Sequence, residues 1–407
     1  MRSWSVDAPA EVPGRPPALR VHDTATGELR PVSPGATFSM YVCGITPYDA
    51  AHLGHAATYL TYDIVLRLLL DAGVEVLYTQ NVTDVDEPLF ERAAETGDDW
   101  ESLGSREIEQ FRADMTALNI LPPTHFVGAV EAVPQIVELV GRLRDAGVTY
   151  DVDGDTYLSV ASWERFGEIG HLDRDAMVEL SRRNGGDPDR PGKKDPLDPV
   201  LWLAARDGEP SWPAPWGAGR PGWHVECSAI AQSTLGDTMD LHGGGTDLIF
   251  PHHEMSATTS CLATGTWPFA RTWLHQAMVA LHGEKMSKSK GNLVFVRHLR
   301  LEHDPIAIRL ALLAHHYQEP WEWLHDDVLR AQERLARWRR AVARASGQPA
   351  GDVLDGVRRH LADNLDAPGA LAVVDRWADE TIRVGGSDLS APTQVRDLVN
   401  ALLGVPL

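Results

Sequence analysis

The chain has 407 residues, 43% hydrophobic and 23% charged, a composition typical of a globular protein with two or three domains. Its formal net charge is −21, from 37 basic and 58 acidic residues, which disfavours a polyanionic partner because phosphate is bound mainly by Lys and Arg. No apolar run is long enough to span a membrane, no signal-peptide core follows the first residues, and three cysteines are too few for a disulfide framework, so we expect a cytoplasmic protein.

Residues 36–120 have the pattern of the first half of a nucleotide-binding α/β domain. A Pro-rich lead-in at 1–35 precedes this half and contributes one short strand. Within 36–120, β-favouring runs alternate with amphipathic helical spacing, as in parallel α/β units. We expect the elements of both segments, in chain order, at residues 18–21 (strand), 38–42 (strand), 56–72 (helix), 74–82 (strand) and 106–118 (helix).

Residues 121–221 differ in composition and predict an inserted connective subdomain. Within it, the segment RRNGGDPDRPGKKDPLDP at 182–199 is rich in Gly, Pro and charge and predicts a mobile surface stretch. The apolar residues 200–203 directly after this segment indicate that it folds back onto the body of the protein. We expect the regular elements of the insertion at 132–145 (helix), 148–152 (strand) and 156–160 (strand).

Residues 222–302 predict the second half of the same sheet, and residues 303–407 predict a bundle made of helices only. The second half contains the run Gly243-Gly244-Gly245, which is a flexible turn or a place where the backbone approaches a ligand closely. Its elements are expected at 228–235 (helix), 239–242 (strand), a helix ending at 264, and 272–279 (strand). The bundle helices are expected at 305–315, 326–345, 353–361, 370–381 and 393–402. The expected fold class is α/β, with a Rossmann-like domain split by an insertion and followed by the bundle.

Two short motifs border the expected sheet. His52 and His55 have the spacing H-x-x-H at a strand-to-helix junction, where free N–H groups attract phosphate and Gly54 lets a flat ligand approach the backbone. Taken alone, such a pair more often consists of ordinary helix-start residues. The sequence KMSKS at 285–289, taken alone, could be a solvated basic loop.

Together, HLGH and KMSKS resemble the signature pair of class I aminoacyl-tRNA synthetases, so we expect a class I synthetase-type nucleotide-binding domain. These enzymes split ATP between its α- and β-phosphates, a reaction that proteins catalyse by placement and electrostatics. The resemblance implies that His52 and His55 stabilise charge on the α-phosphate, that Lys285 and Lys288 hold the leaving pyrophosphate, and that Mg²⁺ accompanies ATP.

Cys43, Cys227 and His252 are far apart in the sequence, so their spacing alone does not predict a metal site, and each alone would more often be a core residue. However, YVCGxTxYDxxHLGH, GWHVECSAIA, LHGGGTDLIFPHHE and KMSKSKGN resemble cysteinyl-tRNA synthetases, in that family's order, over about residues 36–380. The resemblance implies one Zn²⁺ per chain, held by these three residues, that binds the substrate thiolate and rejects serine. Cys261 lies in none of these motifs and is expected in the core.

The same resemblance implies a set of residues around the adenylate. They come from the ends of the expected strands and from the starts of the helices that follow them. The set consists of Cys43, Gly44, Ile45, Thr46, Thr58, Asn81, Val82, Thr83, Trp223, Gly245, Thr246, Asp247 and Val279.

The sequence departs from the cysteinyl-tRNA synthetases in three places. Ser256 stands where those enzymes have a second glutamate as a zinc ligand, CGIT replaces CGPT, and only roughly 105 residues (407 − 302) follow the catalytic part, where an anticodon-binding module would be expected. In addition, RNGGDPDRPGK resembles the ERGGDP-type segment of the mycothiol-pathway cysteine ligases, a family paralogous to the synthetase. That resemblance implies activation of L-cysteine by ATP and transfer to the amine of glucosaminyl-inositol (1D-myo-inositol 2-amino-2-deoxy-α-D-glucopyranoside), with release of AMP and pyrophosphate.

Two other functions remain as alternatives. A short cysteinyl-tRNA synthetase would need an RNA-binding surface, and the basic run RAQERLARWRRAVARA at 330–345 could supply it or could be a solvated helix face with Leu335, Trp338 and Val342 inward. A non-catalytic zinc-binding regulator would be expected to have lost one signature motif, and both are intact. We therefore expect a monomer that acts on ATP, L-cysteine and glucosaminyl-inositol, with no stable nucleic-acid complex and no membrane association.

Overall fold

The computed structural model describes residues 1–286 and 291–407, so Lys288 lies outside the described residues, as does the side chain of Lys285. Its centre is a five-stranded sheet in the order β11-β10-β3-β4-β5, and every neighbouring pair is parallel. This confirms the expected α/β class with a sheet drawn from two separate stretches of the chain. The five strands are β3 (Thr37–Ile45), β4 (Glu75–Val82), β5 (His125–Gly128), β10 (Leu241–Gly245) and β11 (Trp273–Gln276).

The alternation of side chains along β3 divides the core between the two faces of the sheet. Phe38, Met40 and Val42 pack into one hydrophobic cluster, which also contains α1 (Leu53–Asp71) and the C-terminal helices. Tyr41 and Cys43 point to the opposite face and join a second cluster with the helices of that side. Because successive strand residues face opposite sides, the position of Cys43 in β3 decides which helices its thiol meets.

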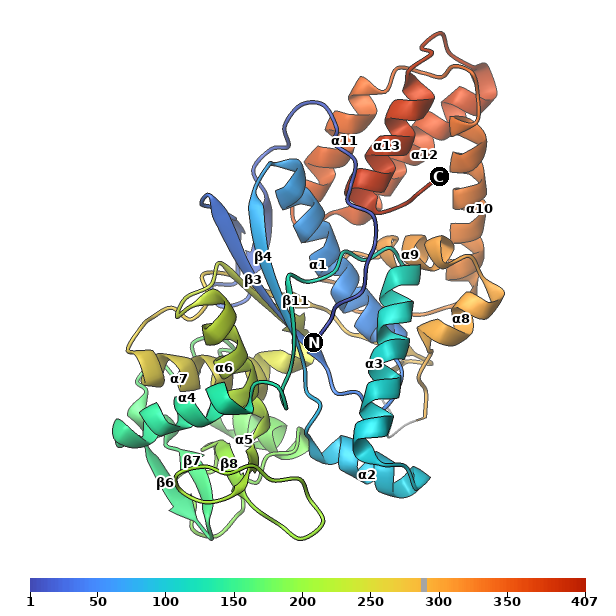
Figure 1. Cartoon of the computed structure of the whole chain (residues 1–407). Coiled ribbons are helices and arrows are strands. Elements are labelled where there is room, and N and C mark those ends of the chain that lie inside the picture. Colours follow the sequence, from blue (N-terminus) through green and yellow to red (C-terminus); the bar gives the residue numbers. More distant parts are fainter. Residues whose placement is uncertain (287–290) are drawn as a thin grey trace.

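Helices cover both faces of the sheet (Figure 1). On one face, α1 packs against the sheet and carries the C-terminal bundle on its outer side. On the other face lie α4 (Val133–Asp145), α6 (Trp223–Leu235) and α7 (Glu254–Thr264). The remaining helices are α2 (Glu87–Thr96), α3 (Trp100–Ala117), α5 (Arg174–Arg183), α8 (Val296–Glu302), α9 (Pro305–Leu313), α10 (His325–Val342), α11 (Gly351–Ala362), α12 (Ala367–Val384) and α13 (Ala391–Leu403), with short turns at Val160–Ser162, Thr246–Leu248 and Ile249–His253.

The part of the chain between β5 and α6 carries a small antiparallel sheet in the order β6-β7-β8-β9. Its strands are β6 (Thr149–Val152), β7 (Asp155–Leu158), β8 (Val200–Ala204) and β9 (Gly219–Pro221). The charged segment at 182–199 packs back against this sheet, as predicted: Arg190 Nη1 lies 2.6 Å from Asp155 Oδ2, and Leu197 is buried. Lys193 Nζ, 2.8 Å from Asp187 Oδ1, holds the segment together.

Three expectations about secondary structure were wrong in detail. The strand expected at 272–279 ends with β11, because Ala277 N donates to Tyr317 O at 2.7 Å and the chain leaves the sheet there. It resumes as β12 (Val279–Leu281), which pairs with β13 (Glu284–Lys285) and with β14 (Trp321–Glu322), so residues 303–407 are not helices only. The lead-in has two paired strands rather than one, β1 (Arg20–Asp23) and β2 (Glu28–Pro31).

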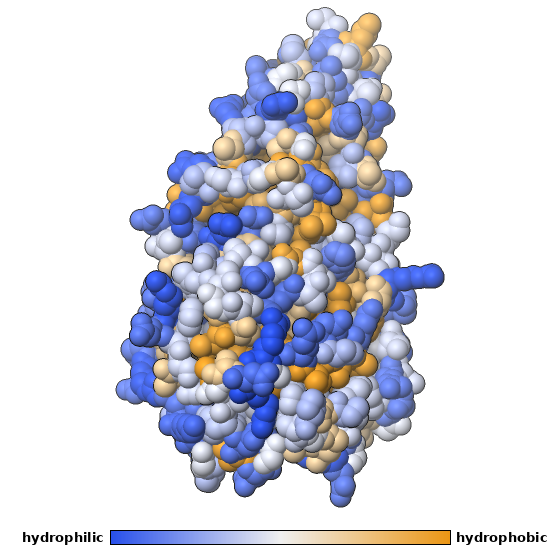
Figure 2. All heavy atoms as spheres, turned by 60° about the vertical axis from the view of Figure 1, so that its left-hand side comes forward, coloured by the Kyte–Doolittle hydropathy of each residue, from blue (hydrophilic) through white to orange (hydrophobic). Residues whose placement is uncertain are grey.

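The surface agrees with the composition. Hydrophilic residues predominate on the face drawn in Figure 2, and hydrophobic side chains show there in separate patches. Within the described residues, no helix combines the length and the apolar character that crossing a bilayer requires.

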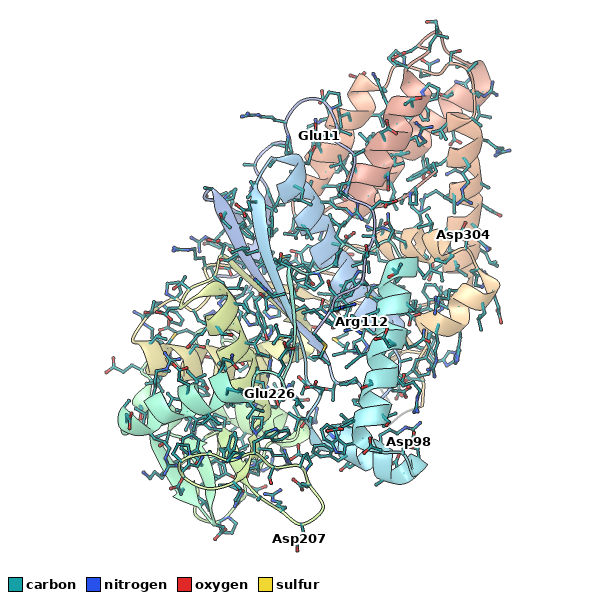
Figure 3. All side chains as sticks on the ribbon, viewed as in Figure 1. Glu11, Asp98, Arg112, Asp207, Glu226 and Asp304 are labelled. Atoms are coloured by element: carbon teal, nitrogen blue, oxygen red, sulfur yellow. The ribbon has the colours of Figure 1, made fainter. Side chains whose placement is uncertain are left out.

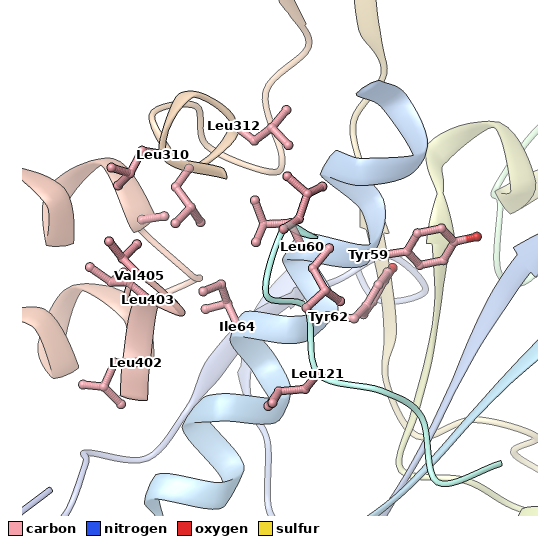
Figure 4. Packing of buried hydrophobic residues seen from close by; sticks show 14 of the residues in the cluster. Tyr59, Leu60, Tyr62, Ile64, Leu121, Leu310, Leu312, Leu402, Leu403 and Val405 are labelled. Atoms are coloured by element: carbon pink, nitrogen blue, oxygen red, sulfur yellow. The ribbon is translucent and has the colours of Figure 1, made fainter. Parts of the chain in front are cut away.

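A buried charge network joins α1 to the bundle. Asp63, fully buried on α1, accepts from Arg67 Nε at 2.8 Å, from Arg309 of α9 and from Leu121 N. Burial alone raises the pKa of the Asp63 carboxyl, but Arg309 and Arg67 bring that pKa below its ordinary value. Around this network Leu60 and Ile64 of α1 face the residues of α9 and of the C-terminus (Figure 4), so the bundle is fixed to the domain of the central sheet by both charge and apolar contact.

We expect Asp63→Ala to lower the free energy of unfolding by about 3–5 kcal/mol, because two guanidinium groups would remain buried without their carboxylate. The measurement is a urea titration followed by tryptophan fluorescence. Glu179→Ala is the matched control, since Glu179 pairs with Arg182 and Arg183 on the exposed side of α5. A midpoint for Asp63→Ala as close to wild type as that of the control would contradict a stabilising role for the network.

Candidate active site and metal centre

The two histidines of HLGH lie together at the N-terminus of α1. His52 is the N-cap residue, and its Nδ1 accepts from Gly54 N at 3.1 Å. The ring of His55 stacks on that of His52, with centroids 3.8 Å apart and an interplanar angle of 25°. The imidazoles are thus held at the N-terminal end of a helix, where the helix dipole favours an anionic phosphate.

The chain after KMSKS is hydrogen-bonded to the HLGH segment. Leu53 N donates to Val294 O at 2.9 Å, and Val296 N donates to Ala51 O at 3.0 Å. At the start of the motif, Lys285 ends β13 and the Met286 side chain is buried in the core. The first two residues of KMSKS are therefore anchored, and residues 294–296 after it are hydrogen-bonded to the histidine motif and the residue before it.

The ends of β3 and β4 approach each other unusually closely. Gly44 N donates to Asn81 Oδ1 at 2.8 Å, and Thr83 N donates to Ile45 O at 2.9 Å. A Cβ on Gly44 would lie 1.6 Å from Asn81 O, so this contact requires glycine. Five of the expected adenylate residues thus share the carboxyl edge of the sheet, namely Gly44, Ile45, Asn81, Val82 and Thr83.

The glycine run forms strand β10 rather than a flexible turn. Tyr62 of α1 explains Gly243, because its ring would lie 2.2 Å from a Cβ there, and its hydroxyl oxygen also accepts from Gly244 N at 2.6 Å. β3 lies between β10 and β4, with the chain running outward on both sides, so the edge between β3 and β10 is the switch point where open α/β sheets bind ligands. Gly245 ends β10 at this edge, and Thr246 and Asp247 follow it directly.

The structure brings Cys43, Cys227 and His252 together. Their ligand atoms lie within 4.8 Å of one another: the two Sγ atoms are 4.0 Å apart, and His252 Nε2 is 3.2 Å from Cys227 Sγ. All three side chains are buried. Two sulfurs and one imidazole form a soft donor set that suits zinc and leaves a fourth tetrahedral position open, so the residues fit the metal that the resemblance implies.

Neighbouring side chains orient His252. Its Nδ1 lies 3.0 Å from His224 Nδ1, and the Trp223 ring stacks on it with centroids 4.3 Å apart. Burial and then the neighbouring His252 lower the pKa of His224 well below its usual range, so His224 is neutral and can accept the Nδ1 proton of His252. That tautomer leaves Nε2 of His252 with a lone pair directed at the cysteines, as a metal ligand needs.

The two cysteines differ in their electrostatic surroundings. Burial raises the pKa of the Cys43 thiol, and its contact with Cys227 raises it further. Burial also opposes ionisation of Cys227, but the hydrogen bond from Cys43 and the adjacent His252 together bring the pKa of Cys227 below its ordinary value.

Ser256, which replaces the expected glutamate ligand, is turned away from the cluster. Its hydroxyl donates to His224 O at 3.1 Å, and Ser228 Oγ donates to Ser256 O at 2.9 Å. These bonds join α7 to α6. Ser256 thus helps to pack α7 against α6. The motifs supply three potential metal ligands at the cluster, namely Cys43, Cys227 and His252.

A second potential donor set shares Cys43. His242 of β10 and His253 offer ring nitrogens that lie, with Cys43 Sγ, within 4.8 Å of one another. The contact between Cys43 Sγ and His253 Nε2 is 3.3 Å. Both histidines are fully buried, and sequence reasoning missed them because neither has a metal-site spacing to Cys43.

The remaining sequence candidates lie in less specific surroundings. Thr58 donates to Gly54 O at 3.0 Å on the second turn of α1, and Thr46 follows β3. The Val279 side chain is buried in the core, and its carbonyl accepts from Met286 N at 3.2 Å. Cys261 is buried outside the cluster, as predicted.

Glu226 is a further candidate that sequence reasoning missed. It lies on α6 beside the sheet (Figure 3), is fully buried, and within the described part of the chain neither carboxyl oxygen meets a hydrogen-bond partner. Burial, followed by Asp86, Cys227 and Asp84, raises the pKa of Glu226 well above its ordinary value. The sequence feature that could have identified Glu226 is its position next to Cys227 in the motif GWHVECSAIA.

Known proteins resemble the chain in both sequence and fold. A family model described as the tRNA synthetase class I (C) catalytic domain matches residues 30–333. The L-cysteine:1D-myo-inositol 2-amino-2-deoxy-alpha-D-glucopyranoside ligase of Streptosporangium roseum is 58% identical, over all of both chains. That of Thermobifida fusca is also 58% identical, covering 100% of this chain and 99% of its own length.

Solved structures agree with the fold. Mycobacterium tuberculosis methionyl-tRNA synthetase in complex with methionyl-adenylate is 17% identical, with a TM-score of 0.66 over 90% of this chain and 92% of that chain. A leucyl-tRNA synthetase from Agrobacterium radiobacter in a ternary complex is 12% identical, with a TM-score of 0.67 over 92% of this chain and 84% of that chain. At these identities the likeness shows the fold alone, and it confirms the class I synthetase type. Given the family model and the full-length relatives, the chain belongs to the family of L-cysteine:1D-myo-inositol 2-amino-2-deoxy-alpha-D-glucopyranoside ligases, which is built on the class I tRNA synthetase catalytic domain.

Proposed function

We propose that the protein is an ATP-dependent ligase that activates L-cysteine as cysteinyl-adenylate and transfers it to the amine of 1D-myo-inositol 2-amino-2-deoxy-α-D-glucopyranoside, a step of mycothiol biosynthesis. Relatives of equal length carry this name. The single observation that supports it best is the Cys43, Cys227 and His252 cluster at the switch point of the sheet. A thiol-selective site beside an adenylate site is what activation of cysteine requires.

In the first step, the carboxylate of cysteine attacks the α-phosphorus of ATP and pyrophosphate leaves. His52 and His55, at the start of α1, are the residues proposed to stabilise the charge that develops on the α-phosphate. Lys285 and Lys288 are the proposed partners of the leaving pyrophosphate, with Mg²⁺ bound to the nucleotide. Gly44 to Thr46, Asn81 to Thr83 and Gly245 to Asp247 are the proposed adenylate contacts along the sheet edge.

Selection of cysteine is assigned to the three-residue cluster. Zinc bound there would supply a soft Lewis-acidic position for the substrate thiolate, which binds it far more strongly than the hydroxyl of serine does. Since Ser256 donates to a backbone carbonyl, we infer that the substrate sulfur takes the remaining coordination position. Trp223, stacked on His252, would border the amino acid.

In the second step, the unprotonated amine of the sugar attacks the carbonyl carbon of the adenylate and AMP leaves. The surroundings of α10 favour such a small acceptor over tRNA. Leu335 and Trp338 are buried, and within the described residues four of the five arginines of this helix are paired with acidic residues at close range. The pairs are Arg330–Asp327, Arg334–Asp375, Arg337–Asp375 and Arg339–Asp304.

We expect Cys43→Ser to reduce bound zinc from about one per chain to near none, and to abolish cysteine-dependent pyrophosphate exchange, because a hydroxyl is a poor zinc ligand. Elemental analysis and the exchange assay are the measurements. Cys261→Ser is the control, since this buried cysteine lies outside the cluster and should keep its metal. Stoichiometric zinc in Cys43→Ser would remove Cys43 from the ligand set.

Lys288→Ala is expected to slow cysteinyl-adenylate formation on the order of 10²-fold or more while changing cysteine binding little, because the charge is needed as pyrophosphate leaves. Pyrophosphate exchange gives the rate, and isothermal titration gives the affinity for cysteine. Lys194→Ala tests the effect of removing an exposed lysine elsewhere; Lys194 lies over the Tyr150 ring. Equal exchange rates in the two variants would show that Lys288 has no part in the chemistry.

The acceptor assay separates the ligase from a short synthetase, since both would exchange pyrophosphate with ATP in the presence of cysteine. Zinc-loaded protein is given ATP and radiolabelled cysteine with either glucosaminyl-inositol or cysteine-specific tRNA. We expect label in the small cysteinyl amide and none in acid-precipitable RNA, because tRNA binding would require a salt-sensitive basic face. Efficient charging of the tRNA without amide formation would overturn the proposed function.

A further inference from the structure

A line of four side chains connects the cluster of Cys43, Cys227 and His252 to the N-terminal segment. Cys43 Sγ lies 3.3 Å from His253 Nε2, His253 Nδ1 lies 2.8 Å from His275 Nε2, and His275 Nδ1 lies 2.6 Å from Thr24 Oγ1. The four residues come from four separate parts of the fold: β3, the turn before α7, β11 and the turn after β1. Cys43, His253 and His275 are buried, and Thr24 is partly exposed.

Counting protons shows that the contacts of this line depend on one another. A neutral imidazole has one N–H donor and one acceptor nitrogen, so each ring can donate in one direction only. Burial lowers the pKa of His275 to about 3, which keeps this ring neutral. The three contacts must therefore all donate toward Cys43 or all donate toward Thr24.

Metal coordination selects between these two directions. A coordinated Cys43 is a thiolate without a proton, so His253 must donate to it through Nε2–H. His253 Nδ1 must then accept from His275 Nε2–H, and His275 Nδ1 must accept from the hydroxyl of Thr24. Within the described residues, the Thr24 hydroxyl is the donor that lies within hydrogen-bond distance of His275 Nδ1.

The backbone fixes Thr24 in the position that the line requires. Thr24 N donates to Trp273 O at 2.8 Å, and Trp273 N donates to Asp23 Oδ1 at 2.9 Å. These two bonds attach the turn after β1 to β11, the strand that carries His275. The lead-in segment is thus linked to the Cys43 thiol through the contact between Thr24 and His275.

We propose that Thr24 is a positioning residue for the Cys43 thiolate, acting through His275 and His253. Its hydroxyl fixes both rings in the Nε2–H tautomer, so that an N–H group points at the sulfur. A hydrogen bond of this kind orients a thiolate ligand and adjusts the charge that the sulfur gives to the metal, and loss of such partners weakens metal binding. The inference rests on the proposed metal site and adds the N-terminal turn to it.

The test compares zinc affinity, by competition with a chelator, in Thr24→Val, Thr24→Ser and Thr26→Val. We expect about 10- to 100-fold weaker zinc binding in Thr24→Val, which removes only the donor, and near-normal binding in Thr24→Ser, which keeps it. Thr26→Val is the control from the same turn, because Thr26 donates to Asp23 and not to His275. Thr24→Val with the affinity of the control would overturn the proposal.

A second measurement needs no substitution at Thr24. Long-range ¹H–¹⁵N spectra of zinc-loaded protein with ¹⁵N-histidine report the tautomer of each ring, and His253→Gln and His275→Gln assign the two signals. We expect the Nε2–H form for both rings in the wild-type protein, and a mixed or reversed tautomer of His275 in Thr24→Val. An Nδ1–H form of either ring in the wild-type zinc protein would overturn the proposal.

The outcomes also separate this inference from the proposed function. A wild-type protein that takes up no zinc would overturn both. A wild-type protein that binds zinc and forms the cysteinyl amide, with unchanged affinity and tautomers in Thr24→Val, would overturn the role of Thr24 alone.

Discussion

The arrangement of the catalytic part and the bundle depends on one interaction, the pairing of the Asp63 carboxylate with Arg67 and Arg309. Arg67 and Arg309 both contact the carboxylate, and both are buried where an unpaired charge would be very costly. The two guanidinium groups also donate to backbone carbonyls after α3 and near the end of α13, including Asn119 O and Leu403 O. Because α1 begins at the His52 motif, the network that holds the bundle also fixes the helix that presents the histidines to the sheet edge.

Much of this arrangement could be predicted because it follows from local patterns. Apolar runs with turn signals predict the central strands, and the carboxyl ends of parallel strands necessarily share one edge of the sheet. Motifs that follow β3 and β10 must therefore lie close together, although almost 200 residues separate them. The meeting of Cys43 with Cys227 and His252 needs one more fact, the alternation along β3, which directs the thiol to the face that α6 and α7 cover.

Other features were beyond sequence reasoning because tertiary contacts create them. β14 is two residues long, and its pairing with β12 leaves no periodic signal. The Ser256 hydroxyl is committed to a carbonyl of α6, which the sequence shows only as the absence of a glutamate. Thr24 and His275 lie 251 residues apart, and their contact exists because the turn after β1 docks on β11. The residues around these groups in the sequence form no recognisable motif, so their contacts can be identified only in the folded structure.

The charge distribution connects the fold to the choice of acceptor. Binding a tRNA would require arginines free to neutralise phosphates, yet Arg334 and Arg337 of α10 share Asp375, which also accepts from Trp338 Nε1. Phosphate would have to displace these internal pairs in a protein of net charge −21, at a cost that counterion release would not easily offset. A small amino sugar requires no such surface. The role proposed for the cluster, selection of cysteine, does not depend on the acceptor, so a class I catalytic domain can keep its first step unchanged while the second substrate differs completely in size and charge.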